Sequence, residues 1–282
     1  MKTLRIAALP DGTHRISPLA LPFIRRSGIA DAENYRKQSR GETSAINFNP
    51  NAADALRAIT LTGGRFTGLA SDRQGSLLTF VVAGAPTLAI GDERRTIEPG
   101  DIFLTDAESA AQIALEIGEE TRLVQIVVDP AWPGDGAELP DEGTVLPRRA
   151  SGPKLKRIYK GEDDRAYYSE FAELFGAPSG QWSEPKPIVG FRILRWEDGE
   201  MDWHPCVTNQ LAIISAGELE FEVGGDGGST EIFHAGDVCI AEDKTGEGHF
   251  NRARGVAFVT IMVVDQAHIW PSEHSHPEAA PA

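Results

Sequence analysis

Two histidines and the residues spaced around them are the part of this 282-residue chain best suited to chemistry. His204 is followed by Cys206 and Gln210, and His249 comes later in the chain. Alternate residues of a strand face the same side, so His204, Cys206 and Gln210 can form one inward row. Imidazole suits several transition metals. We therefore predict one divalent ion (Fe, Zn, Mn, Ni or Cu) held by His204, His249, Gln210 and Cys206.

The spacing resembles the two motifs of the cupin superfamily, G-x5-H-x-H-x3-4-E-x6-G and G-x5-P-x-G-x2-H-x3-N. The first motif fits without insertion from Cys206 to Gly217, and Gly236, Gly246 and His249 follow the second. This resemblance implies a jelly-roll barrel and places the metal ligands at the motif positions. It also implies a small organic substrate, because members with such sites include dioxygenases, isomerases, decarboxylases and lyases.

The chain departs from the cupin pattern at several motif positions. Cys206 stands where the family has a second His, Gln210 stands where it has Glu, and Lys244 replaces the Pro of the second motif. The interval before Lys244 is two residues longer than the pattern, and the final Asn is not in its place. An amide donates less electron density than a carboxylate, so the departures favour a metal-free pocket, whereas the retained His pair favours a metal.

The chain also contains a second copy of this pattern. Ala83-Gly84 and residues 97–104 read like Ala216-Gly217 and residues 233–240, at offsets of 133 and 136. A Gly-rich hairpin at residues 224–229 accounts for the difference, and residues 123–129 match 259–265 at 136 again. The repeat predicts an all-β bicupin: two antiparallel jelly-roll barrels in tandem.

The first copy lacks the candidate ligands. At these offsets His204, Cys206, Gln210 and His249 correspond to Ser71, Arg73, Leu77 and Ile113. We therefore expect the site in the C-terminal barrel, and a structural role for the N-terminal barrel that could include pairing two copies as a homodimer.

Composition sets the domain ranges. We predict an N-terminal barrel at 1–132, a Pro- and Gly-rich linker at 133–153, a C-terminal barrel at 154–270 and a disordered tail at 271–282. Apolar residues at a helical period predict a short amphipathic helix over 163–176, in the inter-domain region.

Charge and cysteine content limit the classes of binding partner and the cellular location that we expect. The net charge of −15 argues against nucleic acid and anionic membrane, which call for clustered Lys and Arg. The N-terminal ten residues read as a strand rather than as a targeting signal, and no apolar run is long enough to span a bilayer. The chain has two cysteines, Cys206 and Cys239. We expect a cytoplasmic protein with reduced thiols whose partner is a small molecule.

Each candidate residue also has a plain structural explanation. Cys206 could be a small core residue, Gln210 could satisfy neighbouring polar groups, and Cys239 reads as core packing. Trp196 has the inward parity of His204 and could line a substrate pocket or belong to the core, whereas Trp203 should face outward.

Two functions remain open. The first hypothesis is a metal-dependent enzyme of dioxygenase, isomerase or lyase type, and the alternative is a non-catalytic bicupin that binds or senses a small molecule without metal. The sequence does not decide whether the protein is an enzyme.

Overall fold

The computed structural model describes residues 1–30, 32–42, 51–140, 152–225 and 227–265, and strands account for most of its regular structure. The all-β prediction is confirmed. The predicted tail at 271–282 and most of the predicted linker at 133–153 lie outside the described residues, so the four domain ranges stay predictions. Within the described chain, no helix has the length and apolar character needed to cross a bilayer.

The described residues of the first half of the chain form strands and two short helices. They are β1 (Thr3–Ala8), β2 (His14–Pro18), β3 (Phe23–Ala30), α1 (Glu33–Ser39), β4 (Ala53–Leu61), β5 (Gly64–Phe66), β6 (Ser76–Ala83), β7 (Thr87–Ile90), β8 (Glu93–Thr96), β9 (Ile102–Thr105), α2 (Ala107–Ala110), β10 (Ala114–Ile117) and β11 (Thr121–Val128).

The second half contains three long strands among several short ones. Its elements are β12 (Leu155–Lys160), β13 (Ala166–Glu170), a 3-10 turn (Ala172–Phe175), β14 (Lys186–His204), β15 (Gln210–Val223), β16 (Ser229–Phe233), β17 (Val238–Ala241) and β18 (His249–Val264). Below, "N-terminal set" means β1, β2 and β4 to β11, and "C-terminal set" means β12 to β18.

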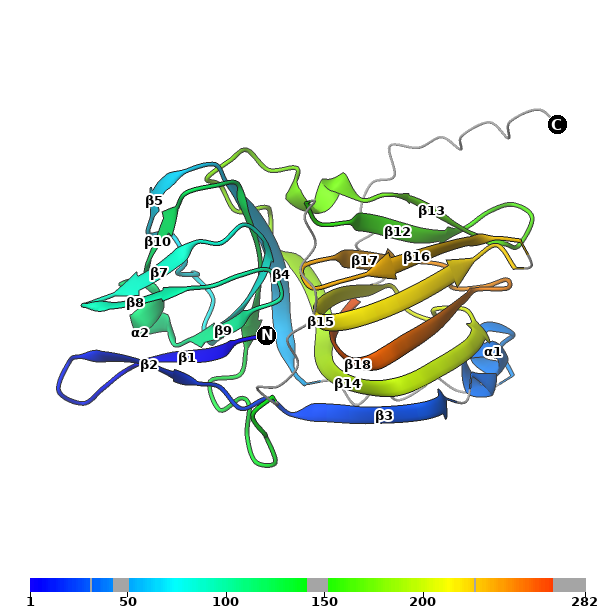
Figure 1. The fold of residues 1–282 in the computed structure, drawn as a ribbon, viewed down its shortest axis with the longest axis horizontal. Helices are drawn as coiled ribbons and strands as arrows, with labels where there is room; N and C mark the ends of the chain where they lie inside the picture. The colour runs from blue at the N-terminus through cyan, green and yellow to red at the C-terminus, as the bar shows by residue number, and fades with distance from the viewer. Residues whose placement is uncertain (31, 43–50, 141–151, 226, 266–282) are drawn as a thin grey trace.

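The two sets repeat one strand order. Read outward from the junction of β4 and β14, the large sheet runs β4-β11-β6-β9-β1-β2 on one side and β14-β18-β15-β17-β12-β13 on the other (Figure 1). The registers match as well: Leu77 pairs with Thr105, and Gln210 pairs with Ala241, at the offsets of 133 and 136 read from the sequence. The long strand β18 corresponds to two separate strands of the N-terminal set, β10 and β11. Strand β10 pairs with β7 and strand β11 pairs with β6, just as β18 pairs with β15.

The repeated Gly-Asp pair has the same structural role in each set. The Asp101 carboxylate accepts hydrogen bonds from the backbone N–H groups of Lys2 (2.6 Å) and Glu98 (3.0 Å). The Asp237 carboxylate accepts them from Lys154 (2.7 Å) and His234 (2.8 Å). Each carboxylate thereby closes its own turn and holds the residue before a neighbouring parallel strand.

A shared core joins the two sets, and each set also has an interior of its own. On β6, Leu78, Phe80 and Val82 face the shared core, which also takes Leu211 and Ile213 of β15. The side chains between them along each strand face inward instead, as the two-residue period of a strand requires.

Two glycines allow the sets to approach closely. A Cβ on Gly100 (φ +88°) would overlap the carbonyl oxygen of Ser215, and a Cβ on Gly236 (φ +88°) would overlap that of Val82. Gly100 and Gly236 are the repeated glycines of the two Gly-Asp turns, so the contact is reciprocal.

Three details differ from the sequence prediction. The helix predicted over 163–176 is wrong, because residues 166–170 form β13, which pairs with β12, and only a 3-10 turn follows. The strands are not all antiparallel, since β1 with β9, β12 with β17 and β3 with β14 are parallel pairs. Finally, β3 comes from the N-terminal half but pairs with β14 of the C-terminal set, and α1 follows it (Figure 1).

Candidate functional site

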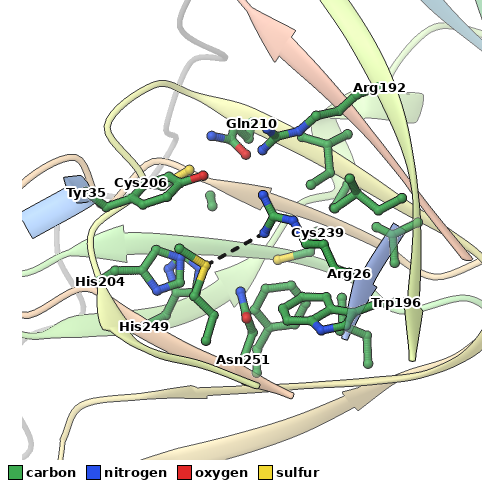
Figure 2. Close-up of a pocket in the computed structure, with 18 residues that line it drawn as sticks. Arg26, Tyr35, Arg192, Trp196, His204, Cys206, Gln210, Cys239, His249 and Asn251 are labelled. Atoms are coloured by element: carbon green, nitrogen blue, oxygen red, sulfur yellow. Dashed lines mark hydrogen bonds between the residues drawn. The ribbon is translucent and has the colours of Figure 1, made fainter. Parts of the chain in front are cut away.

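A cavity of about 50 Å³ lies inside the C-terminal set, and every residue predicted for the site lines it. One water molecule needs roughly 10–15 Å³ measured this way, so the cavity has room for a group of about three to five water-sized units. The polar lining residues are Arg26, Tyr35, Arg192, His204, Cys206, Gln210, Cys239, His249 and Asn251 (Figure 2). The larger apolar ones are Leu194, Trp196, Met201, Leu219, Phe221, Val259 and Ile261.

The two histidines are neighbours across two strands. His204 ends β14 and His249 begins β18; they are register partners, with ring centroids 4.6 Å apart. Gly248 (φ +78°) makes this crossing possible, because a Cβ there would overlap the carbonyl of His204. The sequence prediction that both imidazoles face one pocket agrees with this placement.

Hydrogen bonds fix both rings at Nδ1. His204 Nδ1 lies 2.7 Å from the carbonyl oxygen of Asp202, which can only accept, so Nδ1 carries the proton. His249 Nδ1 lies 2.7 Å from Oδ2 of the buried Asp243. Burial, together with the neighbouring His249, holds the pKa of His204 well below its ordinary value, so this ring is neutral at neutral pH. The neutral His204 ring therefore carries its lone pair on Nε2.

Cys206 and Gln210 lie on the loop that joins β14 to β15 and at its end. The Cys206 thiol donates to the carbonyl of Thr208 at 3.0 Å, and Gln210 Nε2 donates to the Thr208 hydroxyl at 3.2 Å. Burial raises the pKa of the Cys206 thiol well above its usual value, which disfavours the thiolate that a metal requires.

Two lining residues come from the N-terminal half and were not predicted. Arg26 of β3 reaches Met201 Sδ at 3.9 Å, and Tyr35 of α1 places its ring 5.2 Å from that of His204. Arg36 fastens α1 here, donating to the Trp203 carbonyl at 2.8 Å and to an Asp202 oxygen at 3.0 Å. No local sequence pattern connects residues so distant in the chain, since Arg26 and Met201 are 175 positions apart.

A cross-strand row of four residues forms one wall of the cavity. Ile261 pairs with Arg192 and with Ala212, and Ala212 pairs with Cys239. All four line the cavity. We call them the C-terminal interior row.

The N-terminal set has the corresponding row, filled by larger side chains. Gln125 pairs with Arg57 and with Thr79, and Thr79 pairs with Phe103. Phe103 is fully buried among the aliphatic side chains of the N-terminal interior. Cys239 stands in the place of Phe103 in the C-terminal row, and the smaller side chain leaves space there.

The charge of the cavity comes from arginines. Figure 2 shows the Arg26 and Arg192 side chains reaching into the pocket. Burial lowers the pKa of Arg192, but a guanidinium stays charged at neutral pH. None of the lining residues is Asp or Glu. The charged side chains that line the cavity are therefore both positive, and the buried Asp243, bonded to His249, is the neighbouring acid.

The donor set fits a metal ion only in part. A ring that donates from Nδ1 and offers Nε2 is typical of a metal-ligating histidine. Among the described residues, however, no three His, Cys, Asp or Glu side chains are grouped closely enough to hold an ion. The two imidazoles would need the Gln210 amide oxygen, or an atom of the bound small molecule, as the third donor to an ion.

Comparisons with known proteins give structural likeness alone. No family model matches the chain, and no curated protein matches it. Similar solved structures include a cupin 2 conserved barrel domain protein from Leptotrichia buccalis, at 12% identity over 80% of this chain and 94% of the other, with a TM-score of 0.38.

Two further examples are similar over most of this chain. A protein of unknown function of the DUF861 family from Pseudomonas syringae pv. tomato matches at 16% identity over 94% of this chain and all of the other, with a TM-score of 0.36. Oxalate decarboxylase from Lactobacillus farciminis, in a formate complex, matches at 15% identity over 76% and 78%, with a TM-score of 0.29. Cupin-domain proteins are thus among the structures this chain resembles, in agreement with its motifs, and the likeness carries nothing about ligand or reaction.

Proposed function

We propose that the C-terminal set binds a small organic molecule in its interior cavity. The supporting observation is the exchange of Phe103 for Cys239 at equivalent positions of the two interior rows. A phenyl ring fills the N-terminal interior, whereas a thiol at the same place leaves room beside the two histidines.

The lining suits a molecule with an apolar body and a polar end. Trp196, Phe221 and Val259 offer apolar contact, while the neutral His204 imidazole presents Nε2 as a hydrogen-bond acceptor. Ligand pockets commonly combine apolar walls with a few placed polar groups. The histidines at the cupin motif positions thereby acquire a binding role that does not require a metal.

Refilling the cavity tests this proposal. Cys239→Phe restores the side chain found in the N-terminal row, and Cys239→Ala is the matched control that keeps the cavity open. Binding of propanoate and propanamide would be measured by saturation-transfer NMR on the wild type and both variants. We expect at least one probe to bind the wild type and the Ala variant, and neither to bind the Phe variant. Equal binding in the folded Phe variant, or no binding to any of the three proteins, would sink the proposal.

A metal site is the second candidate, and the two Nδ1 hydrogen bonds favour it. His204 and His249 would hold the ion through Nε2, with Gln210 as third donor and Cys206 beside it. Such an ion would act as a Lewis acid on the bound molecule, in dioxygenase-, isomerase- or lyase-type chemistry. The protein's own part would be to orient both rings and to exclude water.

Metal analysis distinguishes the two candidates. Cobalt(II) titration of the purified protein, followed by its visible spectrum, should give one equivalent in the wild type if the metal candidate holds. His204→Ala and His249→Ala should each abolish that spectrum, while Cys206→Ser should weaken binding without eliminating it. The same spectrum in wild type and His204→Ala would rule out the ligand assignment.

A further inference from the structure

The two interior rows place an arginine at the same position, and the residues that face these two arginines differ in kind. Gln125 faces Arg57 across β11 and β4, and Ile261 faces Arg192 across β18 and β14. The step from Gln125 to Ile261 is the offset of 136 that runs through this part of the repeat.

In the N-terminal set, the chain supplies the oxygen atoms that the guanidinium binds. Arg57 donates from Nε (2.9 Å) and Nη2 (2.5 Å) to the Gln125 side-chain oxygen, and Nη2 also reaches the carbonyls of Leu69 and Ala70. The Gln125 amide donates in turn to the Thr79 hydroxyl at 3.1 Å, which holds it in place. One planar oxygen-bearing group therefore lies against the fork of the guanidinium.

In the C-terminal set, the residues at the places of Gln125 and Thr79 are aliphatic. Ile261 stands in the place of Gln125, and Ala212 stands in the place of Thr79. Arg192 remains buried at the cavity and interacts with Tyr35, while Arg26 adds a second positive charge. No Asp or Glu lines the cavity, and the buried Asp243 is already bonded to His249, so an anion that enters the cavity stabilises the buried guanidinium.

We infer that the small molecule bound by the C-terminal set is a carboxylate, and that its carboxylate group lies against Arg192 where the Gln125 amide lies against Arg57. The inference rests on the binding function proposed above. A carboxylate has the planar shape of a carboxamide, and its two oxygens match the parallel N–H groups of a guanidinium. The apolar wall of the cavity favours a short acid with an apolar body over a fully polar tetrahedral anion such as phosphate.

A substitution can give Arg192 an amide neighbour like the one that Gln125 provides for Arg57. Ile261→Gln carries the residue of the N-terminal row into the C-terminal row, and Ile261→Leu is the matched aliphatic control. Dissociation constants for propanoate, propanamide and inorganic phosphate would be measured by NMR titration on the wild type, both variants and Arg192→Met. Circular dichroism and thermal midpoints would establish that each protein is folded.

We expect the wild type to bind propanoate roughly tenfold or more tightly than propanamide, the factor typical of a charged hydrogen bond. Ile261→Gln and Arg192→Met should each lose about that factor for propanoate, whereas Ile261→Leu should stay within about threefold of the wild type. If Ile261→Gln does not fold, Arg192→Met carries the test alone.

The outcomes distinguish the carboxylate inference from the proposed small-molecule binding on which it rests. Equal affinity for propanoate and propanamide, tighter binding of phosphate, or unchanged propanoate binding in the folded Ile261→Gln and Arg192→Met variants would overturn the carboxylate inference and leave small-molecule binding in place. No binding of either organic probe to the wild type would overturn both.

Discussion

Adding one methyl group at Gly100 should destabilise the whole molecule. Gly100 has φ +88°, and a Cβ there would overlap the Ser215 carbonyl oxygen and lie 2.9 Å from the Ala235 Cβ. The left-handed backbone costs an L-residue about 1–2 kcal/mol, and overpacking a close contact adds about 1–3 kcal/mol. Reduced freedom of the unfolded chain returns roughly 0.4–1 kcal/mol. We expect Gly100→Ala to lower the free energy of unfolding by roughly 1–4.5 kcal/mol.

A second glycine separates the backbone cost from the overpacking cost. Gly12 has φ +80°, and beyond its chain neighbours no atom lies within 4 Å of where a Cβ would be, so Gly12→Ala should cost only the backbone share, about 1 kcal/mol. Gly236→Ala, at the reciprocal contact, should resemble Gly100→Ala. Urea unfolding followed by far-ultraviolet circular dichroism measures all three variants. If Gly100→Ala is no less stable than Gly12→Ala, the close approach of the two sets is not a packed contact and the reasoning fails.

Buried thiols, the anchoring of α1 and the Gly-Asp turns each give a further prediction. Burial raises the pKa of Cys206 and Cys239 well above 9.0, so both thiols should react with Ellman's reagent only in denaturant. The free energy of unfolding should also fall as the pH rises above the unfolded thiol value near 9.0. Rapid reaction of the native protein would contradict this. Arg36→Ala removes the hydrogen bonds that fasten α1, so amide hydrogen exchange in α1, measured by mass spectrometry, should accelerate by about tenfold or more. Unchanged exchange would mean that other contacts hold α1 in place. Asp237→Ala and Asp101→Ala each leave two backbone N–H groups without their acceptor. Each variant should lower the free energy of unfolding, measured in urea, by about 2–4 kcal/mol. A loss in only one of the two variants would show that the turns are not equivalent.

The motif spacing and the repeat predicted more of the site than of its surroundings. The single inward strand row predicted for His204, Cys206 and Gln210 is wrong, because β14 ends at His204, Cys206 lies in the loop and Gln210 begins β15. All three nevertheless reach the cavity with His249. Trp196 lines it too, as its parity indicated.

Long-range pairing explains what the sequence analysis missed. The helical period over 163–176 was genuine, but residues 166–170 pair as an edge strand with β12, and the backbone hydrogen bonds of that pairing outweigh local propensity. Arg26 and Tyr35 enter the site through a parallel pair between distant segments, for which no short pattern exists. The arginines at 57 and 192 could have been found by extending the repeat comparison to β4 and β14.

The pairing of β3 with β14 also sets an order of events during protein synthesis. Arg26 leaves the ribosome well before its contact Met201, which is 175 positions further along the chain. At roughly 5–20 residues per second, the ribosome needs about 10–35 s to make that interval. During this time β3 has no partner from the C-terminal set, and its exposed Ile24 and Ile29 lie on an unpaired edge that other chains can bind. The pocket can therefore form only after the C-terminal set has been synthesised, and slower translation should increase aggregation of the nascent chain.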